Sequence, residues 1–383
     1  MSAPRSGVAG AAPHAASLAP RFGIYVHVPY CLSVCPYCDF NVYVGDGDDA
    51  ARYLDAVLIE TRARAGEASE PAGTIFLGGG TPSLIAPEPM KRFLDALRQI
   101  VPVRADAEVT MEANPETVTV ETLRGYRAAG INRLSLGVQS FAPHVLGGLG
   151  RTHTPQQARD AVAFARAAGF DNVSIDLIFG GPGESRADWD ATLSDAVALG
   201  TDHVSCYGLT IEDGTAFGSA VAHGRMTPPD EDDLAAKYEA ACDALPLRHY
   251  EISNWGTPSR HNLIYWTQGD YLGLGAGAHS HRAGIRSWNR KLPRAYAADP
   301  AAARDGDEHL DDPARAREWL HLRLRLVEGI DLDEAAAHLG HDLTPLAGPL
   351  QQAGLAFLDG GRFILTRRGL LLENEVALRL GAA

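Results

Sequence analysis

A repeated unit of strand, turn and helix fills much of the first half of the chain and limits the folds open to it. Short apolar segments predict strands, and segments with the periodicity of an amphipathic helix lie between them. Alternating strands and helices with short loops imply parallel pairing, in a barrel or an open doubly wound sheet. After an apolar run at 23–28, strands are expected at 74–77, 108–112, 133–138, 173–178 and 203–209. Helices are expected at 48–66 and near 87–100, 120–129, 155–168 and 186–199, and Gly130, Gly169 and Gly200 are placed to end three of them.

Polar or glycine-rich residues follow each of the first five strands of this pattern. In an α/β barrel the carboxyl ends of all strands open on one face, where the reactive groups gather. One shared site therefore explains these residues better than a solvated surface does. The residues are Cys31, Cys35 and Cys38, then Gly78-Gly-Gly-Thr-Pro82, Glu112-Ala-Asn-Pro115, Gln139-Ser-Phe141 and Asp176-Leu-Ile-Phe-Gly180.

Three thiols, Cys31, Cys35 and Cys38, lie within eight residues and predict a metal site. A structural zinc ion needs four ligands, and no fourth cysteine follows nearby, since Phe40 stands two residues after Cys38. A [4Fe–4S] cluster held by three thiolates leaves one iron free for an outside ligand, most naturally S-adenosylmethionine. The alternatives are a zinc knuckle completed by His27 or a distant histidine, and three buried thiols without a metal.

Other candidate site residues have plainer alternatives. The Gly78-Gly-Gly-Thr-Pro82 turn allows close approach of a ligand, with amide groups free to bind a carboxylate or amine, although glycine turns are common in barrels. Glu112 and Asp176 either cap loops or bind the amino group or ribose hydroxyls of a nucleoside. Gln139 and Arg151 would hold ribose or a carboxylate, while Arg151 is otherwise a surface residue.

Composition limits the partners and the compartment. The chain has 383 residues, is 45% hydrophobic and carries a net charge of −14, which argues against a nucleic-acid or anionic-membrane surface. Five cysteines, three of them clustered, suit a reducing cytoplasm rather than a disulfide framework. No apolar run approaches the roughly 18 residues of a spanning helix. Residues 1–21 predict a disordered tail, and a parallel-barrel segment is expected at 22–211.

The alternation of strands and helices fails beyond residue 211. Residues 212–300 hold an acidic, helix-prone piece and then an aromatic, glycine-rich stretch that contains His261, His279 and His281. His261 is either a satisfied buried histidine or an iron ligand in a flat aromatic group such as heme, and the other two are further candidates for that role. Residues 301–383 predict a compact α+β module that resembles a winged helix, without a basic run for DNA binding.

Taken together, these motifs resemble the radical S-adenosylmethionine family around oxygen-independent coproporphyrinogen oxidase, and within it the HemW-type heme chaperones. The match runs from about residue 22 to the C-terminus, in type and in order. It is carried by the three-cysteine loop ending Cys38-Asp-Phe40, the GGGTP turn, Glu112-Ala-Asn-Pro, Ser135-Leu-Gly-Val-Gln-Ser-Phe141, Arg151 and Asp176-Leu-Ile-Phe-Gly180. The resemblance implies an incomplete (β/α)6 barrel of the TIM type followed by a C-terminal winged-helix-like module.

The resemblance also implies roles for individual residues. Cys31, Cys35 and Cys38 would hold the [4Fe–4S] cluster, and His261 matches a proposed heme contact. Tyr25, Gly79 and Glu112 match contacts to the cluster-bound S-adenosylmethionine. Tyr37, Gly80, Thr81, Gln139, Arg151 and Asp176 match contacts to a second S-adenosylmethionine in the oxidase.

Two features favour the chaperone over the oxidase. The oxidase has a further cysteine where this chain has Phe40, and a longer N-terminal arm that residues 1–20 do not resemble. The His261-Asn-x-x-Tyr-Trp266 motif followed by Tyr271-x-Gly-x-Gly is typical of HemW-like chains. The expectation is a cytoplasmic protein that binds the cluster, S-adenosylmethionine and heme, and passes heme to acceptor hemoproteins. A flavodoxin-type electron donor and a homodimer are further expectations, and the alternative is radical decarboxylation of coproporphyrinogen III.

Overall fold

A computed structural model describes residues 14–381, and its centre is one twelve-stranded sheet. Strand β1 lies inside this sheet, between β4 and β11, and pairs in parallel with both. Parallel pairing continues from β4 through to β8. The parallel strands, in spatial order, are β11 (Asp270–Leu274), β1 (Phe22–Val28), β4 (Ala72–Gly79), β5 (Val103–Ala113), β6 (Arg133–Gln139), β7 (Val173–Phe179) and β8 (His203–Gly208).

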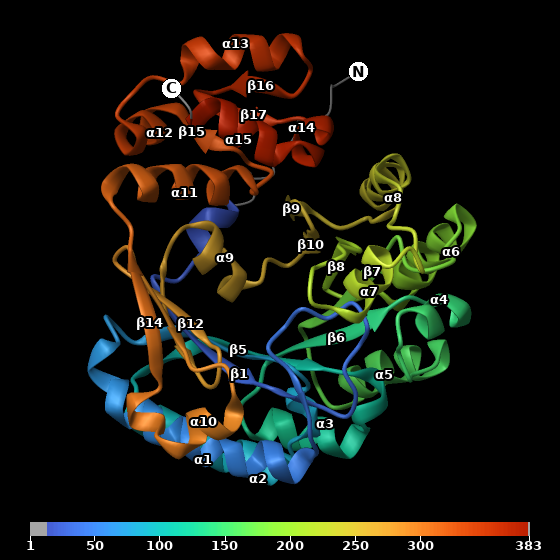
Figure 1. Ribbon diagram of the computed structural model, residues 1–383, viewed down its shortest axis with the longest axis vertical. Helices are drawn as coiled ribbons and strands as arrows, with labels where there is room; N and C mark the ends of the chain where they lie inside the picture. The colour runs from blue at the N-terminus through green and yellow to red at the C-terminus, as the bar shows by residue number, and fades with distance from the viewer. Residues whose placement is uncertain (1–13, 382–383) are drawn as a thin grey trace, which may run out of the picture.

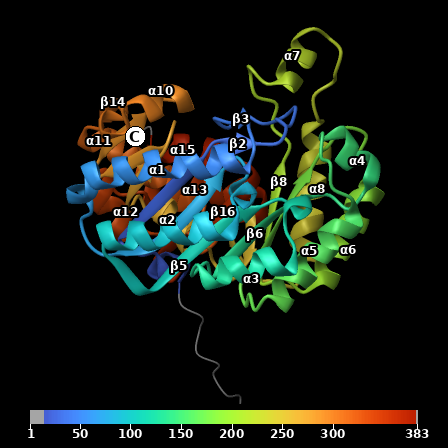
Figure 2. The same ribbon diagram turned by 90° about the horizontal axis from the view of Figure 1, so that it is seen from below.

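Helices connect successive parallel strands and cover the outer face of the sheet. Neighbouring helices α1, α2 and α3 pack side by side along that face (Figure 1), and the view from below shows them in front of the strands (Figure 2). The helices between β1 and β8 include α1 (Gly47–Arg64), α2 (Pro87–Ile100), α3 (Val120–Ala128), α4 (Pro143–Gly148), α5 (Pro155–Ala167) and α6 (Arg186–Leu199). Six strands of this sheet, β1 and β4 to β8, confirm the predicted incomplete (β/α) barrel.

Antiparallel strands extend the sheet at both edges, so it does not close within the described residues. Beyond β8 lie β10 and β9, and beyond β11 lie three more strands, with β14 and β9 at the two ends. Strand β14 belongs to this sheet although it follows residue 300, where the last sequence segment was expected to begin. The added strands are β9 (His249–Glu251), β10 (Asn254–Gly256), β12 (His279–Arg282), β13 (Ile285–Asn289) and β14 (Arg304–His309).

Local sequence signals explain where the connecting helices begin and end. Thr154 and Ser185 each open a helix with a reciprocal capping box, in which the side chain accepts from the backbone three residues later. Gly130, Gly169 and Gly200 have φ angles of 88°, 86° and 58°, which side chains other than glycine rarely adopt. The predicted left-handed helix ends at these glycines are therefore confirmed.

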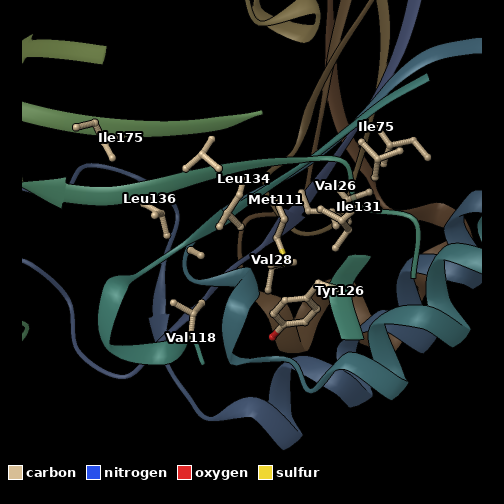
Figure 3. Close-up of a cluster of buried hydrophobic side chains, with 14 of the residues drawn as sticks. Val26, Val28, Ile75, Met111, Val118, Tyr126, Ile131, Leu134, Leu136 and Ile175 are labelled. Carbon is tan, nitrogen blue, oxygen red and sulfur yellow. The ribbon is translucent and has the colours of Figure 1, made fainter. Parts of the chain in front are cut away.

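The main hydrophobic core lies between the sheet and its outer helices. Six of the seven residues of β1 are buried, as expected for a central parallel strand that is covered on both faces. Figure 3 shows part of this core, in which Val26 of β1, Met111 of β5 and Leu134 of β6 belong to the same buried cluster as Tyr126 of α3. The Tyr126 hydroxyl donates to the carbonyl oxygens of Ser83 (3.0 Å) and Ile85 (2.7 Å), so this ring is buried without an unsatisfied polar group.

The C-terminal residues form a separate α+β module with its own hydrophobic cluster, which confirms that prediction (Figure 1). Its two longer strands, β16 and β17, pair as an antiparallel hairpin. Helix α9 (Arg260–Trp266) packs between this module and strands β1 and β4. The elements of the module are α11 (Asp312–Leu324), β15 (Ile330–Asp331), α12 (Leu332–Leu339), α13 (Thr344–Gln352), β16 (Ala356–Asp359), β17 (Arg362–Leu365), α14 (Arg367–Leu371) and α15 (Glu373–Gly381).

Most of the predicted N-terminal tail, residues 1–13, lies outside the described residues. The rest of it is placed on the body of the protein: residues 15–18 form a 3-10 turn, and Ala15 is buried. The amide of Ala16 donates to the Glu328 carboxylate at 3.1 Å, so the disorder expected up to residue 21 does not extend to these residues. No helix within residues 14–381 has the length and apolar character needed to span a membrane.

Candidate functional site

A cavity of about 740 Å³ opens at the carboxyl ends of the parallel strands. The strand ends predicted to share one site do meet there, from the loop after β1 to the end of β7. Most of the residues singled out from the sequence line this cavity, whereas His279 and His281 lie elsewhere. Those in the cavity are Tyr25, Cys31, Cys35, Tyr37, Cys38, Gly79, Gly80, Thr81, Glu112, Gln139, Arg151, Asp176 and His261. Positions spread over more than half of the chain therefore form one wall, as the barrel geometry requires.

The cysteine loop is held at its base by a short parallel pair, β2 (Tyr30–Cys31) and β3 (Tyr43–Val44). The amide of Gly45 donates to the Cys31 carbonyl at 3.0 Å, which ties the two ends of the loop together. Within the loop, the Cys38 amide donates to the Cys35 carbonyl at 3.1 Å in a tight turn. This turn brings the backbones of Cys35 and Cys38 together, and both side chains line the cavity.

Hydrogen-bond donors contact two of the sulfur atoms. The Thr81 hydroxyl lies 3.4 Å from Cys31 Sγ, and the Arg151 guanidinium lies 3.6 Å from Cys35 Sγ. Burial raises the pKa of the Cys31 thiol and raises that of Cys38 to about 11, so metal binding there must displace protons. Three free thiols, two of them with a donor at the sulfur, are the kind of ligands that an iron–sulfur cluster takes, and such hydrogen bonds tune the properties of a cluster.

The glycine turn after β4 contacts the protein rather than presenting free amides. Gly79 donates to Glu112 Oε2 at 3.0 Å, and the Gly80 and Thr81 amides donate to the carbonyls of Val28 (2.7 Å) and Tyr30 (2.8 Å). The expectation of amide groups free to bind a ligand is therefore wrong for these three residues. At Gly79, where φ is 109°, a Cβ atom would lie 2.5 Å from the His27 ring. The glycines are needed because this turn packs directly on β1.

Two acidic side chains, Glu112 and Asp176, lie half-buried in the cavity wall. Burial, with a smaller effect from the nearby Asp176 charge, raises the pKa of Glu112 to about 7. Burial also raises the pKa of Asp176, while hydroxyl donors from Ser205 (2.7 Å) and Ser135 (3.1 Å) oppose that shift. Carboxylates in this setting are suited to bind the hydroxyl groups or the positive charge of a nucleoside cofactor.

A bulge in the sheet positions Gln139 next to Arg151. The β6–β7 register shifts between Gly137 and Gln139, and Gln139 has a φ of 65°, which re-aims the end of the strand. The Arg151 guanidinium donates to Asn114 Oδ1 at 2.7 Å and to the Gly137 carbonyl at 3.2 Å. Arg151 is thus half-buried and fixed at the cavity, unlike the surface residue that was its plain alternative.

His261 is buried, with an exposed fraction of 1%, and both of its ring nitrogens have protein partners. Nδ1 lies 2.7 Å from the Thr74 hydroxyl, and Nε2 lies 2.9 Å from the Tyr265 hydroxyl. Its ring stacks on Phe76, and burial together with the Arg133 charge lowers its pKa to about 3. As placed here, His261 would have to release Tyr265 before its Nε2 could bind iron.

The structure adds cavity residues that the sequence argument missed. Asn114 and Ser135 belong to the motifs that contain Glu112 and Gln139, so the sequence could have predicted that they line the cavity. Arg133 and Ser205 stand on strands without a local signal, and only the pairing of β6, β7 and β8 brings them to Asp176. Such residues need the tertiary fold to be recognised.

Comparisons with known proteins identify the class. The sequence model of the Radical SAM superfamily matches residues 25–196, and that of the HemN C-terminal domain matches residues 310–372. A solved structure, described as coproporphyrinogen III oxidase (HemN) from Escherichia coli, a radical SAM enzyme, has a TM-score of 0.80. It is 23% identical, over 96% of this chain and 92% of that one, and shows the fold alone. Fold and site together define a radical SAM protein.

Curated relatives narrow the class to one family. Proteins named heme chaperone HemW are 42% identical in Mycobacterium tuberculosis, over 94% of both chains, and 34% identical in Bacillus subtilis, over 92% of this chain and 97% of that protein. The Escherichia coli protein of the same name is 37% identical, over 84% of this chain and 87% of its own. The chain belongs to the HemW family of radical SAM proteins. Membership of the superfamily implies a [4Fe–4S] cluster and S-adenosylmethionine.

Proposed function

We propose that this protein is a heme chaperone, which binds a [4Fe–4S] cluster, S-adenosylmethionine and heme and transfers the heme to acceptor hemoproteins. The observation that carries the proposal is end-to-end likeness to proteins named heme chaperone HemW, at 42% identity over 94% of both chains. The cavity supports it, because the residues that the family resemblance assigns to cofactors all line one space.

Within this proposal each group of cavity residues has a chemical task. Cys31, Cys35 and Cys38 hold the cluster, and the donors from Thr81 and Arg151 reduce the negative charge on two of the sulfurs. A cluster of this kind, when bound, supplies an electron for reductive chemistry at the sulfonium of S-adenosylmethionine.

The remaining cavity residues bind and orient S-adenosylmethionine. Glu112 and Asp176 provide negative charge for the cationic cofactor and acceptors for its ribose hydroxyls. The family resemblance assigns the first cofactor molecule to Tyr25, Gly79 and Glu112, and a second one to Tyr37, Gly80, Thr81, Gln139, Arg151 and Asp176. It also assigns a heme contact to His261.

The proposal extends to partners and location. Heme-accepting proteins are the expected recipients, a flavodoxin-type protein is the expected electron donor, and the cytoplasm is the expected compartment. Apolar side chains of the cysteine loop, Leu32, Val34 and Phe40, are exposed by 61%, 46% and 66%, and offer a surface for a protein partner or a second copy of the chain.

The test uses anaerobically reconstituted full-length protein with S-adenosylmethionine and a reductant. Parallel samples receive heme or coproporphyrinogen III, and heme transfer to an apo-hemoprotein is followed by its absorption spectrum. Stoichiometric heme binding and transfer, with no protoporphyrinogen formed, is the expected result. Turnover of coproporphyrinogen III with release of 5′-deoxyadenosine would overturn the chaperone proposal and identify an oxidase.

Binding of S-adenosylmethionine should strengthen as the pH rises through about 7, the pKa of Glu112. Below this pH the Glu112 side chain is neutral, and above it the carboxylate attracts the cationic sulfonium. We expect an affinity roughly tenfold higher at about pH 8 than at about pH 6, which corresponds to about 1.4 kcal/mol. Isothermal titration of cluster-loaded protein measures this. In Glu112→Gln the rise in affinity should be much smaller, with only the titration of the cofactor's own amino group left, and an unchanged dependence would contradict the assignment.

A further inference from the structure

A second cavity, of about 500 Å³, lies beside the first one. The two share six wall residues, Tyr25, Asp39, Phe40, Gly79, Glu112 and Tyr265. The second cavity extends from this shared wall toward the antiparallel side of the sheet, where Tyr271, Gly277, His279 and Lys291 line it. A ligand there would lie next to the cluster cavity without occupying it.

Histidines line both of these cavities and a third, smaller one, but among them only His279 lacks a hydrogen bond at both ring nitrogens within residues 14–381. In the first cavity, both ring nitrogens of His261 have hydrogen bonds, as described above. Both ring nitrogens of His203 are also hydrogen-bonded, to Ser174 at 2.7 Å and to Tyr250 at 2.9 Å. His27 lines the second cavity and is engaged in the same way at both nitrogens. In the third cavity, Nδ1 of His281 bonds to the Gly269 carbonyl at 2.9 Å, while its Nε2 is buried without a partner among the described residues.

His279, at the start of β12, differs from all of these. Its ring has no hydrogen bond to any described residue, it is exposed, and its only ring contact is a tilted one with Trp288 at 6.0 Å. Burial of part of the ring, then the positive charges of Lys291 and Arg286, lower its pKa. The imidazole is therefore neutral near pH 7, which is the form that binds a metal.

The second cavity has its acidic residues on one side and a lysine on the other. Asp39 and Glu112 lie on the wall shared with the first cavity, whereas the Lys291 ammonium has no ion pair within residues 14–381. A flat anionic ligand would therefore turn its carboxylates away from the shared wall and toward Lys291. Phe40, an exposed aromatic ring in the shared wall, and Tyr271 provide apolar surface for such a ligand.

We propose that heme occupies this second cavity, with His279 as the ligand to iron and Lys291 paired with a propionate. The proposal rests on the proposed function, since it requires that the protein binds heme. It assigns the iron ligand to His279 in place of His261, whose nitrogens are already used. It also places the porphyrin edge at Phe40, against the cavity that would hold the cluster.

The test is a titration of the full-length protein with hemin, followed by the Soret absorption of the bound heme. His279→Ala should weaken binding at least tenfold and change the spectrum, and added imidazole should restore the histidine-ligated spectrum. His309→Ala, which removes an exposed histidine of β14, is the matched control and should behave like the wild type. Lys291→Glu should weaken binding but keep the wild-type spectrum, because it leaves the iron ligand in place.

Other outcomes separate the two proposals. If the wild type binds heme and folded His279→Ala matches it in affinity and spectrum, the site assignment is overturned while the chaperone proposal stands. The same conclusion follows if only His261→Ala abolishes the spectrum while circular dichroism shows it folded. If the wild type does not bind heme at all, both proposals fail.

Discussion

Replacement of Cys35 by alanine is expected to leave the reconstituted protein without its cluster. Two thiolates then remain, and a [4Fe–4S] cluster already held by only three ligands loses one of them. Bound iron should fall from about four atoms per chain to near zero, together with acid-labile sulfide and the visible charge-transfer absorption. Chemical analysis of iron and sulfide after anaerobic reconstitution measures the effect.

Cys242→Ala provides the matched control for the cluster. Cys242 is also a free, partly buried thiol, but it lies on α8 (Glu231–Ala244) and lines neither cavity. Its replacement should leave iron and sulfide unchanged. Retention of a full cluster by Cys35→Ala, or loss of it in Cys242→Ala, would show that the thiols of the loop are not the ligands.

Replacement of Glu60 by alanine is expected to cause the largest loss of stability. The Glu60 side chain is completely buried and accepts four hydrogen bonds, from Arg64 (2.8 Å), the Gly275 amide (2.8 Å), Asn289 (2.7 Å) and Tyr296 (2.7 Å). These bonds fasten α1 to the strands beyond β1. Removing the carboxylate leaves Arg64 as a buried charge without this partner and should cost about 3–5 kcal/mol of unfolding free energy.

Urea unfolding, followed by circular dichroism, measures this loss, with Glu67→Ala as the comparison. Glu67 also pairs with Arg64, at 2.9 Å, but its side chain is 30% exposed. Loss of such a pair should cost only about 0–1 kcal/mol. Equal effects of the two substitutions would show that the buried network of Glu60 does not hold the sheet to α1.

The parallel half of the fold was predictable because its strands are buried on both faces. Helices α2 and α6 occur at the predicted residues, and β6 and β7 begin where the apolar runs begin. Strand β5 starts at Val103, earlier than expected. The prediction missed its first residues because they are exposed and include charged side chains such as Arg104 and Asp106. A strand whose side chains face water has no apolar pattern to find.

The antiparallel edge could not be predicted for the same reason. Strand β14 consists entirely of charged and polar residues and glycine, and it becomes a strand only because β13 lies beside it. Short strands of this kind are fixed by their partners rather than by their own sequence.

The candidate site shows a similar division. Motifs at the strand ends correctly indicated which residues share one cavity, since strand order and direction decide that. They did not indicate which polar groups in the cavity are already engaged. The partner of His261 Nδ1 is Thr74, far away in the sequence, and the amides of the glycine turn bond to β1 and Glu112. Only the three-dimensional packing distinguishes these engaged groups from the His279 ring, which has no hydrogen bond to a described residue.

The place of β1 inside the sheet affects how the protein is made on the ribosome. Phe22 pairs with Asp270, so one edge of β1 stays open until synthesis reaches β11. At about 5–20 residues per second, this interval lasts roughly ten to fifty seconds. During that time the thiols of the adjoining loop lack the part of the cavity wall that α9 later provides. The complete cavity around the three cysteines therefore forms only after most of the chain has been synthesised.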